Sequence, residues 1–272
     1  MKINQLADRF GSNRTHAHEP AKHLSGCTCV AVPFAGGLCE VPHFKANVIL
    51  VNDADRHVMN LGRVVRDHKD MLAEKLDGAL FHPDGLAVSQ QFCREAEKKT
   101  PLDTFAWAYH YYVCSWMTRG GKMGTKGEFE QGLSVRWKSG GGDSVVRFRN
   151  AVEGIAEWSE AVKYCTFTTL DAFDFLAECK KRDIAENGIY ADPPWIGDGR
   201  NYTHATAPEL ELAWHRRLAC VLGSFENARI VLRHGESHII RDLYPESRWA
   251  IHQVKSRTQA NQEKAELLIV SK

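Results

Sequence analysis

The stretch that decides the fold class is Cys27-Thr28-Cys29-Val30-Ala31-Val32-Pro33-Phe34-Ala35-Gly36-Gly37. Its first half is small, apolar and β-branched, which is typical of a buried strand, and its second half is a glycine-rich turn. A second apolar run, Val48-Ile49-Leu50-Val51, ends in Asn52-Asp53, and apolar residues then recur at helical spacing at Val58, Leu61 and Val65. Short strands, a turn and a helix in this order predict an α/β fold on a parallel, doubly wound sheet.

The same pattern returns in the last third of the chain. Gly188-Ile189-Tyr190-Ala191 is a short apolar run that leads into Asp192-Pro193-Pro194-Trp195. We expect further strands at residues 229–232, 249–254 and 267–270, and a helix at residues 237–244. No helix is expected between the last two strands, so they predict an antiparallel hairpin at one edge of a mainly parallel sheet.

The middle of the chain differs in character. From residue 105 to residue 149 aromatic and basic side chains interleave, and paired or triple glycines mark turns. Residues 115–150 hold seven basic and three acidic side chains, whereas the whole chain has a net charge of only +1. This concentration of positive charge predicts an inserted segment with one or two β-hairpins. Tyr109, Tyr111 and Tyr112 are expected in its core.

The composition excludes several classes of protein. With 272 residues, 43% hydrophobic and 25% charged, the chain is typical of a globular protein and not of a disordered, collagenous or coiled-coil one. No apolar run is long enough to span a bilayer, and the amino terminus lacks a secretory leader. The eight cysteines are scattered and the thirteen histidines show no metal-ligand spacing, so we expect free thiols, no metal and a cytoplasmic location.

Asp192-Pro193-Pro194-Trp195 is the sharpest chemical signal in the sequence. Two prolines cannot continue a strand ladder, so the chain must leave the sheet at its carboxyl edge, where open α/β sheets bind ligands. A carboxylate and backbone carbonyls beside a flat indole suit an exocyclic amino group on a planar ring. The same four residues also fit a tight turn capped by an aromatic side chain.

The glycine-rich turn and Asp53 form a second signal. Gly36 and Gly37 let the backbone approach a ligand closely, and Asp53, after the second strand, can accept both hydroxyls of a ribose. An ordinary loop and a helix-capping aspartate are the alternatives. The turn is not G-x-G-x-x-G, which disfavours a dinucleotide relative to another nucleoside cofactor.

Taken together, these segments resemble the Dam-related DNA methyltransferases that modify the amino group of adenine with S-adenosylmethionine. The segment from Asp192 to Trp195 is similar to their D-P-P-[YFW] motif. The run from Val32 to Gly37 resembles their E-P-F-x-G-G loop, and Asp53 resembles their ribose-binding acid. Weaker matches follow the family's order along the chain: Phe10-Gly11-Ser12-Asn13, Asp171 and Trp214-His215-Arg216-Arg217-Leu218. Three positions depart from the pattern: Val32 stands for Glu, Leu38 for a third Gly and Asn13 for Lys.

The resemblance implies a Rossmann-like methyltransferase fold with a mixed seven-stranded sheet and an inserted target-recognition domain. Residues 1–60 would form the first part of the core, 61–160 the insertion and 161–272 the second, catalytic part. The implied cofactor-binding residues are Phe10, Gly11, Asn13, Pro33, Phe34, Ala35, Gly36, Asp53, Asp171 and Asp192. A monomer is expected, in a bacterial or phage setting.

The implied reaction is methyl transfer to the N6 amine of adenine in DNA, after the base has flipped out of the helix. The catalytic residues would be Asp192, Pro193, Pro194 and Trp195. Asp192 and the Pro193 carbonyl would accept the amino hydrogens, and Trp195 would stack on the base. No cysteine is needed. The side chains expected to contact DNA phosphates are Arg14, Arg119, Lys122, Lys126, Arg136 and Lys138.

Other functions remain open at this point. D-P-P-W also serves transfer to the 4-amino group of cytosine and to adenine in RNA. A catalytically weak regulator that binds nucleic acid with the same fold fits the departures at Val32, Leu38 and Asn13. A nicotinamide-dependent oxidoreductase is disfavoured because the glycine spacing is missing.

Overall fold

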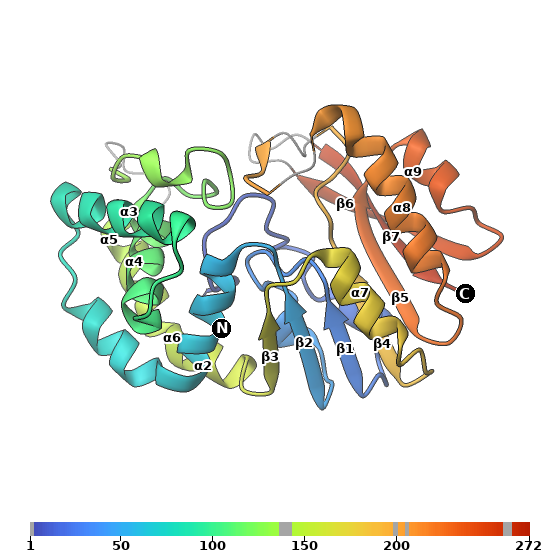
Figure 1. Cartoon of the computed structure of the whole chain (residues 1–272), viewed down its shortest axis with the longest axis horizontal. Helices are drawn as coiled ribbons and strands as arrows, with labels where there is room; N and C mark the ends of the chain where they lie inside the picture. Colours follow the sequence, from blue (N-terminus) through green and yellow to red (C-terminus); the bar gives the residue numbers. More distant parts are fainter. Residues whose placement is uncertain (1–2, 136–142, 198–200, 205–206, 258–262) are drawn as a thin grey trace. The chain divides into compact units, whose positions relative to one another are not determined.

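The computed structural model describes residues 3–135, 143–197, 201–204, 207–257 and 263–272. They form two compact units, each of which is built from several stretches of the chain (Figure 1). The helical unit takes in Met1–Arg14, Gly36–Pro42 and Asp55–Lys163, and the sheet unit takes in Thr15–Ala35, His43–Ala54 and Tyr164–Lys272. The division of the chain into a catalytic core and a target-recognition insertion remains a prediction.

The sheet unit is built on a seven-stranded sheet in the described part of the chain, with the order β3-β2-β1-β4-β5-β7-β6. The strands from β1 to β5 run parallel to one another, whereas β7 is antiparallel to both β5 and β6. The strand bounds are β1 Cys29–Val32, β2 Val48–Asn52, β3 Cys165–Thr168, β4 Asn187–Ala191, β5 Arg229–Gly235, β6 Trp249–Arg257 and β7 Glu263–Ser271. The predicted α/β fold with a mixed sheet and an antiparallel edge hairpin is confirmed.

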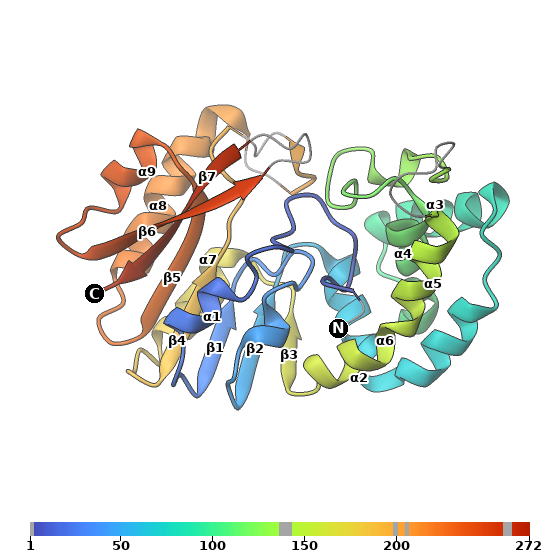
Figure 2. The ribbon, with the colours of Figure 1, turned by 180° about the vertical axis from the view of Figure 1, so that it is seen from behind.

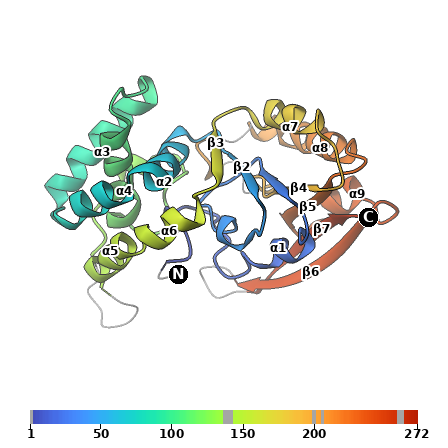
Figure 3. The same ribbon diagram turned by 90° about the horizontal axis from the view of Figure 1, so that it is seen from below.

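Helices cover both faces of this sheet. On one face lie α7 (Ala172–Lys180) and α8 (Glu211–Gly223), and on the other lies α1 (Glu19–His23), as Figures 2 and 3 show from behind and from below. The short helices η1 (Val41–His43) and η4 (Pro208–Leu210) and the helix α9 (His238–Leu243) complete the connections. The apolar core between the sheet and α7, α8 and α9 contains Phe173, Leu176, Ile189, Leu218, Leu222, Ile230, Leu232, Ile240, Leu267 and Ile269. Burial of these side chains is the main force that holds the helices on the strands.

The helical unit is arranged around α4 (Thr104–Met117), which is buried along most of its length. Helix α4 packs on α2 (Arg56–Asp77), α3 (Pro83–Lys98) and α5 (Ser144–Glu153), and α6 (Ile155–Ala161) packs on α2. The short helix η2 (Glu128–Glu130) lies against α3. Aspartates at the amino ends of α2, α4 and α5 accept backbone N–H groups that have no partner within the helix: Asp55, Asp103 and Asp143.

The structure differs from the predicted β-hairpins between residues 105 and 149. The described residues there form α4, a loop, η2 and the start of α5, with isolated bridges in place of strands at Met123, Thr118 and Leu133. The aromatic side chains favour a strand by composition, but Trp107 and Tyr111 lie four residues apart, on one face of a helix. Tyr111 and Tyr112 are fully buried, as expected, and Tyr109 is half-buried.

None of the helices in the described ranges is both long enough and apolar enough to cross a membrane.

Candidate active site

The predicted catalytic turn begins directly after β4, which lies between β1 and β5 in the sheet. The last pairing of β4 with β5 joins Ala191 to Leu232, and Asp192 is the next residue along the chain. Because Pro193 and Pro194 have no N–H group to donate, the ladder cannot continue and the backbone turns away at the carboxyl edge. The sequence thus puts a carboxylate at the end of a central parallel strand, where ligands bind in folds of this class.

Both oxygens of Asp192 accept hydrogen bonds. Arg233 Nη1 donates to Oδ2 at 2.7 Å, and Trp195 Nε1 donates to Oδ1 at 3.2 Å. The side chain of Asp192 is 16% exposed. Burial raises the pKa of this carboxyl above its ordinary value, while the Arg233 guanidinium acts in the opposite direction. Each carboxylate oxygen has a second lone pair, so Asp192 can still accept a hydrogen bond from a substrate.

Arg233 on β5 also binds Glu266 on β7. Its Nε and Nη2 both donate to Glu266 Oε2, at 3.0 and 2.8 Å, and both side chains are 8% exposed. This contact depends on the reversed direction of β7, which brings Glu266 opposite Gly235 at the carboxyl end of β5. The guanidinium therefore lies between two carboxylates that belong to different strands.

The Trp195 ring is held on one side by β5. It stacks on His234 with 5.8 Å between ring centroids, and a Cβ on Gly235 would come within 2.7 Å of Trp195 Cε3. Glycine at 235 is therefore needed for the indole to lie where it does. His234 Nδ1 donates to the Gly235 carbonyl at 2.8 Å and its Nε2 accepts from Ile196 N at 3.2 Å, which is the neutral tautomer.

His215 supports the turn from α8. It is buried, lies edge-on to His234 at 5.3 Å between centroids, and hydrogen-bonds Pro194, whose only backbone polar group is its carbonyl. Burial lowers the pKa of His215 to about 4, so the ring is neutral at pH 7 and donates to that carbonyl. The segment around Trp214 was singled out in the sequence, but no role was predicted for this histidine.

Asn52 joins the other predicted cofactor segments of the sheet unit. Its Nδ2 donates to the carbonyls of Pro33 (3.2 Å) and Leu170 (3.1 Å), and its Oδ1 accepts from Leu170 N at 2.8 Å. The backbone of Asn52 also accepts from Ala35 N at 3.0 Å. Asn52 is completely buried. It thereby holds together the residues that follow β1, β2 and β3.

Three predicted cofactor segments accordingly meet at this edge. Pro33, Phe34 and Ala35 follow β1, and half-buried Asp53 follows β2. Asp171 follows Leu170, and its Oδ1 accepts from Phe173 N at 2.8 Å as the cap of α7. No structural role was predicted for Asn52, although an amide that ends an apolar run was a readable signal.

Aromatic side chains line the same edge. The Phe34 ring lies edge-on to Trp214 at 5.9 Å between centroids, and Trp214 lies edge-on to Phe173 at 5.4 Å. The Arg217 guanidinium lies 3.8 Å from the centroid of Phe173. A carboxylate after β2 and these rings at the same edge of the sheet suit a nucleoside, whose ribose offers hydroxyl donors and whose base offers a flat face.

The remaining predicted cofactor residues lie in the helical unit. Phe10 N donates to the Met123 carbonyl at 3.0 Å, Asn13 is buried, and Gly11 and Gly36 have positive φ values of 74° and 50°. A Cβ on Gly37 would lie 2.7 Å from Ser12 Oγ, so the amino-terminal motif packs closely on the glycine turn.

Two of the departures from the family pattern have visible consequences. Leu38 has φ of 63°, in the left-handed region that favours glycine, and its side chain is fully buried. Val32 is buried at the end of β1 and offers no carboxylate there.

Three of the predicted DNA-binding side chains extend from one loop, residues 118–127. Arg119, Lys122 and Lys126 are exposed, while Met123 and Gly124 between them are buried. No ion pair involves these three cations within the described ranges. Arg14 is also exposed, and Arg136 and Lys138 lie outside the described residues.

Buried polar contacts hold this loop. Gly121 N donates to Asp8 Oδ1 at 3.3 Å, and Gly124 N donates to Glu128 Oε2 at 2.7 Å. Arg147 Nη2 donates to the carbonyl of Thr118 at 2.7 Å. Burial raises the pKa of Glu128 to about 8. The loop therefore has a defined backbone that presents its cations outward.

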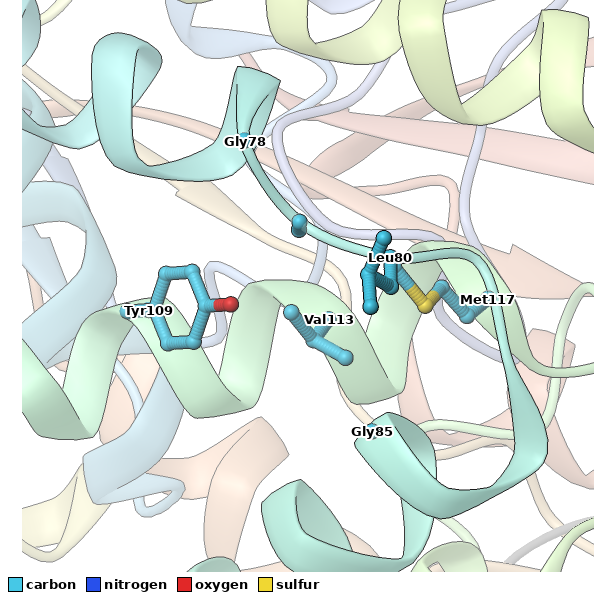
Figure 4. Close-up of a pocket in the computed structure, with 7 residues that line it drawn as sticks. Gly78, Leu80, Gly85, Tyr109, Val113 and Met117 are labelled. Carbon is cyan, nitrogen blue, oxygen red and sulfur yellow. The ribbon is translucent and has the colours of Figure 1, made fainter.

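A cavity of about 270 Å³ lies in the helical unit beside α4, as Figure 4 shows. None of the predicted site residues lines it; the lining consists of Gly78, Ala79, Leu80, Gly85, Tyr109, Val113 and Met117. Among the described residues no cluster of three or more His, Cys, Asp or Glu side chains could hold a metal ion.

Comparisons with known proteins agree with the resemblance read from the motifs. A search of curated proteins finds no match. The family model described as D12 class N6 adenine-specific DNA methyltransferase matches residues 11–260, which include the glycine turn, Asp53 and the Asp192 turn. We conclude that the chain belongs to the D12 class of N6 adenine-specific DNA methyltransferases.

Proposed function

We propose that this enzyme transfers the methyl group of S-adenosylmethionine to the N6 amine of an adenine that has left the DNA stack. The observation that carries the proposal is the position of Asp192. It follows the central strand β4, it is fixed through both oxygens, and the Pro193 carbonyl and the Trp195 ring stand beside it in the chain.

The residues of the sheet unit fit the nucleoside part of the cofactor. Asp53 would accept the ribose hydroxyls, the rings of Phe34 and Trp214 would contact the base, and Asp171 would lie at its adenine end. When bound, S-adenosylmethionine would supply an electrophilic methyl group: its bond to sulfur breaks as the bond to nitrogen forms, S-adenosylhomocysteine leaves, and the methylated nitrogen then loses one proton to water. Four residues of the helical unit remain proposed cofactor contacts: Phe10, Gly11, Asn13 and Gly36.

The catalytic turn would make the amine a better nucleophile. The lone pair of an aromatic amine is delocalised into the ring. Asp192 and the Pro193 carbonyl would accept the two amino hydrogens, which favours a pyramidal nitrogen and directs its lone pair away from these acceptors, towards the methyl group. Trp195 would replace part of the stacking that the flipped base loses. The remaining contribution is positioning of the two reactants in line.

The exposed cations would bind DNA. Arg119, Lys122 and Lys126 extend from a fixed loop, which reduces the conformational entropy lost on binding phosphate. Arg14, Arg136 and Lys138 are proposed as further phosphate contacts.

The test is to weigh the product. We incubate the purified protein with S-adenosylmethionine and DNA from a methylation-free host, digest the DNA to nucleosides and measure their masses. N6-methyldeoxyadenosine is the expected product. Methylation of cytosine, or of adenine in RNA only, would overturn the proposal. Cofactor binding by calorimetry without methyl transfer to DNA or RNA would identify a regulator.

A further inference from the structure

The basic residue Arg233, which contacts the predicted catalytic turn, was not anticipated from the sequence. Arg233 donates to Asp192 through Nη1 and to Glu266 through Nε and Nη2. The five N–H donors of a guanidinium point in fixed directions, so binding Glu266 on two of them determines where Nη1 points. The direction of Nη1 in turn selects the orientation of the Asp192 carboxyl group.

The charges of this cluster do not cancel. Two carboxylates share one guanidinium, and all three side chains are no more than 16% exposed. Removing a carboxylate from water favours its neutral form, and a second carboxylate nearby favours it further. A protonated Asp192 would offer one oxygen as a donor, which cannot accept an amino hydrogen.

We propose that Arg233 is the positioning residue of the active site, which holds Asp192 as an ionised, oriented hydrogen-bond acceptor, while Glu266 fixes the orientation of Arg233. This inference rests on the proposed function. It also explains why Asp192 would accept hydrogen bonds from the amine without removing its proton in the transfer step. A carboxylate bound to a guanidinium is a weak base that remains a good acceptor.

Two histidines of the described residues lie at the turn, and both are neutral. His234 on β5 has one nitrogen donating to the Gly235 carbonyl and the other accepting from Ile196 N. His215 on α8 contacts Pro194, and its pKa is lowered to about 4. Within the described part of the chain, the charged groups that act most strongly on Asp192 are Arg233 on β5 and Glu266 on β7.

The test measures the ionisation of Asp192 directly. Carboxyl carbon NMR follows the titration of each carboxyl group, and D192N assigns the signal of Asp192. Arg233→Gln is expected to raise the midpoint of Asp192 by at least about one pH unit. Glu266→Gln is expected to lower it, because a neighbouring negative charge is removed. Arg233→Lys is expected to restore part of the shift.

The matched control is Arg229→Gln. Arg229 lies on the same strand and donates to the carbonyls of His23 and Ser25, away from the catalytic turn. In the Arg229→Gln variant the titration midpoint of Asp192 is expected to equal that of the parent protein. If the titration midpoint of Asp192 is the same in Arg233→Gln as in Arg229→Gln, the proposal is overturned. If Arg233→Gln does not fold, an unchanged midpoint in Glu266→Gln overturns it.

Methyl transfer supplies the second measurement. With Arg233→Gln, kcat below the new midpoint is expected to fall about tenfold per pH unit, while KM for DNA changes little. The acid limb of the pH profile should move with the NMR midpoint. If the parent protein transfers no methyl group, the proposed function fails. The NMR titration still decides whether Arg233 controls the ionisation of Asp192.

Discussion

The catalytic turn and the basic loop use positive charge in opposite ways. At the carboxyl edge of the sheet, Arg233 is buried and bound to Asp192 and Glu266. In the loop of residues 118–127 the cations are exposed, and the buried carboxyl groups of Asp8 and Glu128 bind the loop backbone. The difference teaches that a buried, paired cation fixes the orientation of the carboxylates it binds. An exposed cation on a rigid loop remains available to a polyanion.

The largest effect is expected from Asp192→Ala. This variant removes the proposed acceptor of the amino hydrogens, and kcat should fall by at least about 10³-fold because one well-placed group stabilises the transition state. DNA affinity should stay close to that of the parent, since the basic loop is intact. Methyl transfer and DNA binding are measured in parallel.

The control for this variant is Asp242→Ala, which removes an exposed carboxylate from α9 in the same unit. It should transfer methyl groups at the parent rate. A parent-like rate in Asp192→Ala would show that the turn does not perform the reaction.

The next effect is expected from replacing Arg119, Lys122 and Lys126 together by Gln. If each binds one phosphate, the slope of log affinity against log salt should decrease by about 2.7. Affinity at about 0.1 M salt should then fall on the order of 10²-fold. In contrast to Asp192→Ala, kcat at saturating DNA should be unchanged. Fluorescence anisotropy over a series of salt concentrations measures the slope.

The control variant removes the same charge elsewhere in the helical unit, at the exposed residues Arg63 on α2, Lys98 on α3 and Lys99 directly after α3. If the slope of log affinity against log salt decreases equally in both triple variants, DNA affinity depends only on net charge. The distinction between the two regions would then break down.

A smaller effect is expected from Trp195→Phe. Phenylalanine retains an aromatic face but cannot donate to Asp192 Oδ1 as the indole does. A lost hydrogen bond to a charged group predicts about a tenfold decrease in kcat, with DNA binding maintained. Steady-state kinetics separate kcat from KM. A parent-like kcat would mean that the ring acts by stacking alone.

The smallest effect on the reaction is expected at His215. Its pKa is about 4 in the folded protein and 6.5 ordinarily, so the unfolded chain takes up a proton first as the pH falls. Stability is therefore greatest above pH 6.5 and is lost towards pH 4 by roughly 3 kcal/mol from this group. His215→Gln should reduce that loss and leave methyl transfer at pH 7.5 near the parent rate.

Urea unfolding of parent and variant at pH 7 and pH 4.5 measures the difference. Equal losses of stability in the two proteins would assign the acid sensitivity to other groups.

Most of the sheet could be predicted because its signals are local. The apolar runs at 27–32 and 48–51 and the two prolines after Ala191 each specify their own segment. The missing helix between the last two strands predicted the antiparallel edge. In the middle segment the described residues form helix α4 and isolated bridges, and the helical spacing of Trp107 and Tyr111 was the signal for that helix; residues 136–142 lie outside the described residues.

The supporting residues of the site could not be predicted in the same way. Arg233 and Glu266 are 33 residues apart in the chain and meet only through the register of β5 and β7. Asn52 binds Leu170 across 118 residues. An arginine at the end of a strand looks like a surface residue until the neighbouring strands are known.

The position of β7 between β5 and β6 has a consequence for biosynthesis. Every other strand of the sheet precedes β7 in the chain, so Glu266 is made last among the residues that support Asp192. On the ribosome the cofactor and substrate segments can be complete while a gap still separates β5 from β6. We expect insertion of this late strand to give Arg233 its second carboxylate, so that Asp192 acquires its full set of supporting contacts only after β7 has joined the sheet.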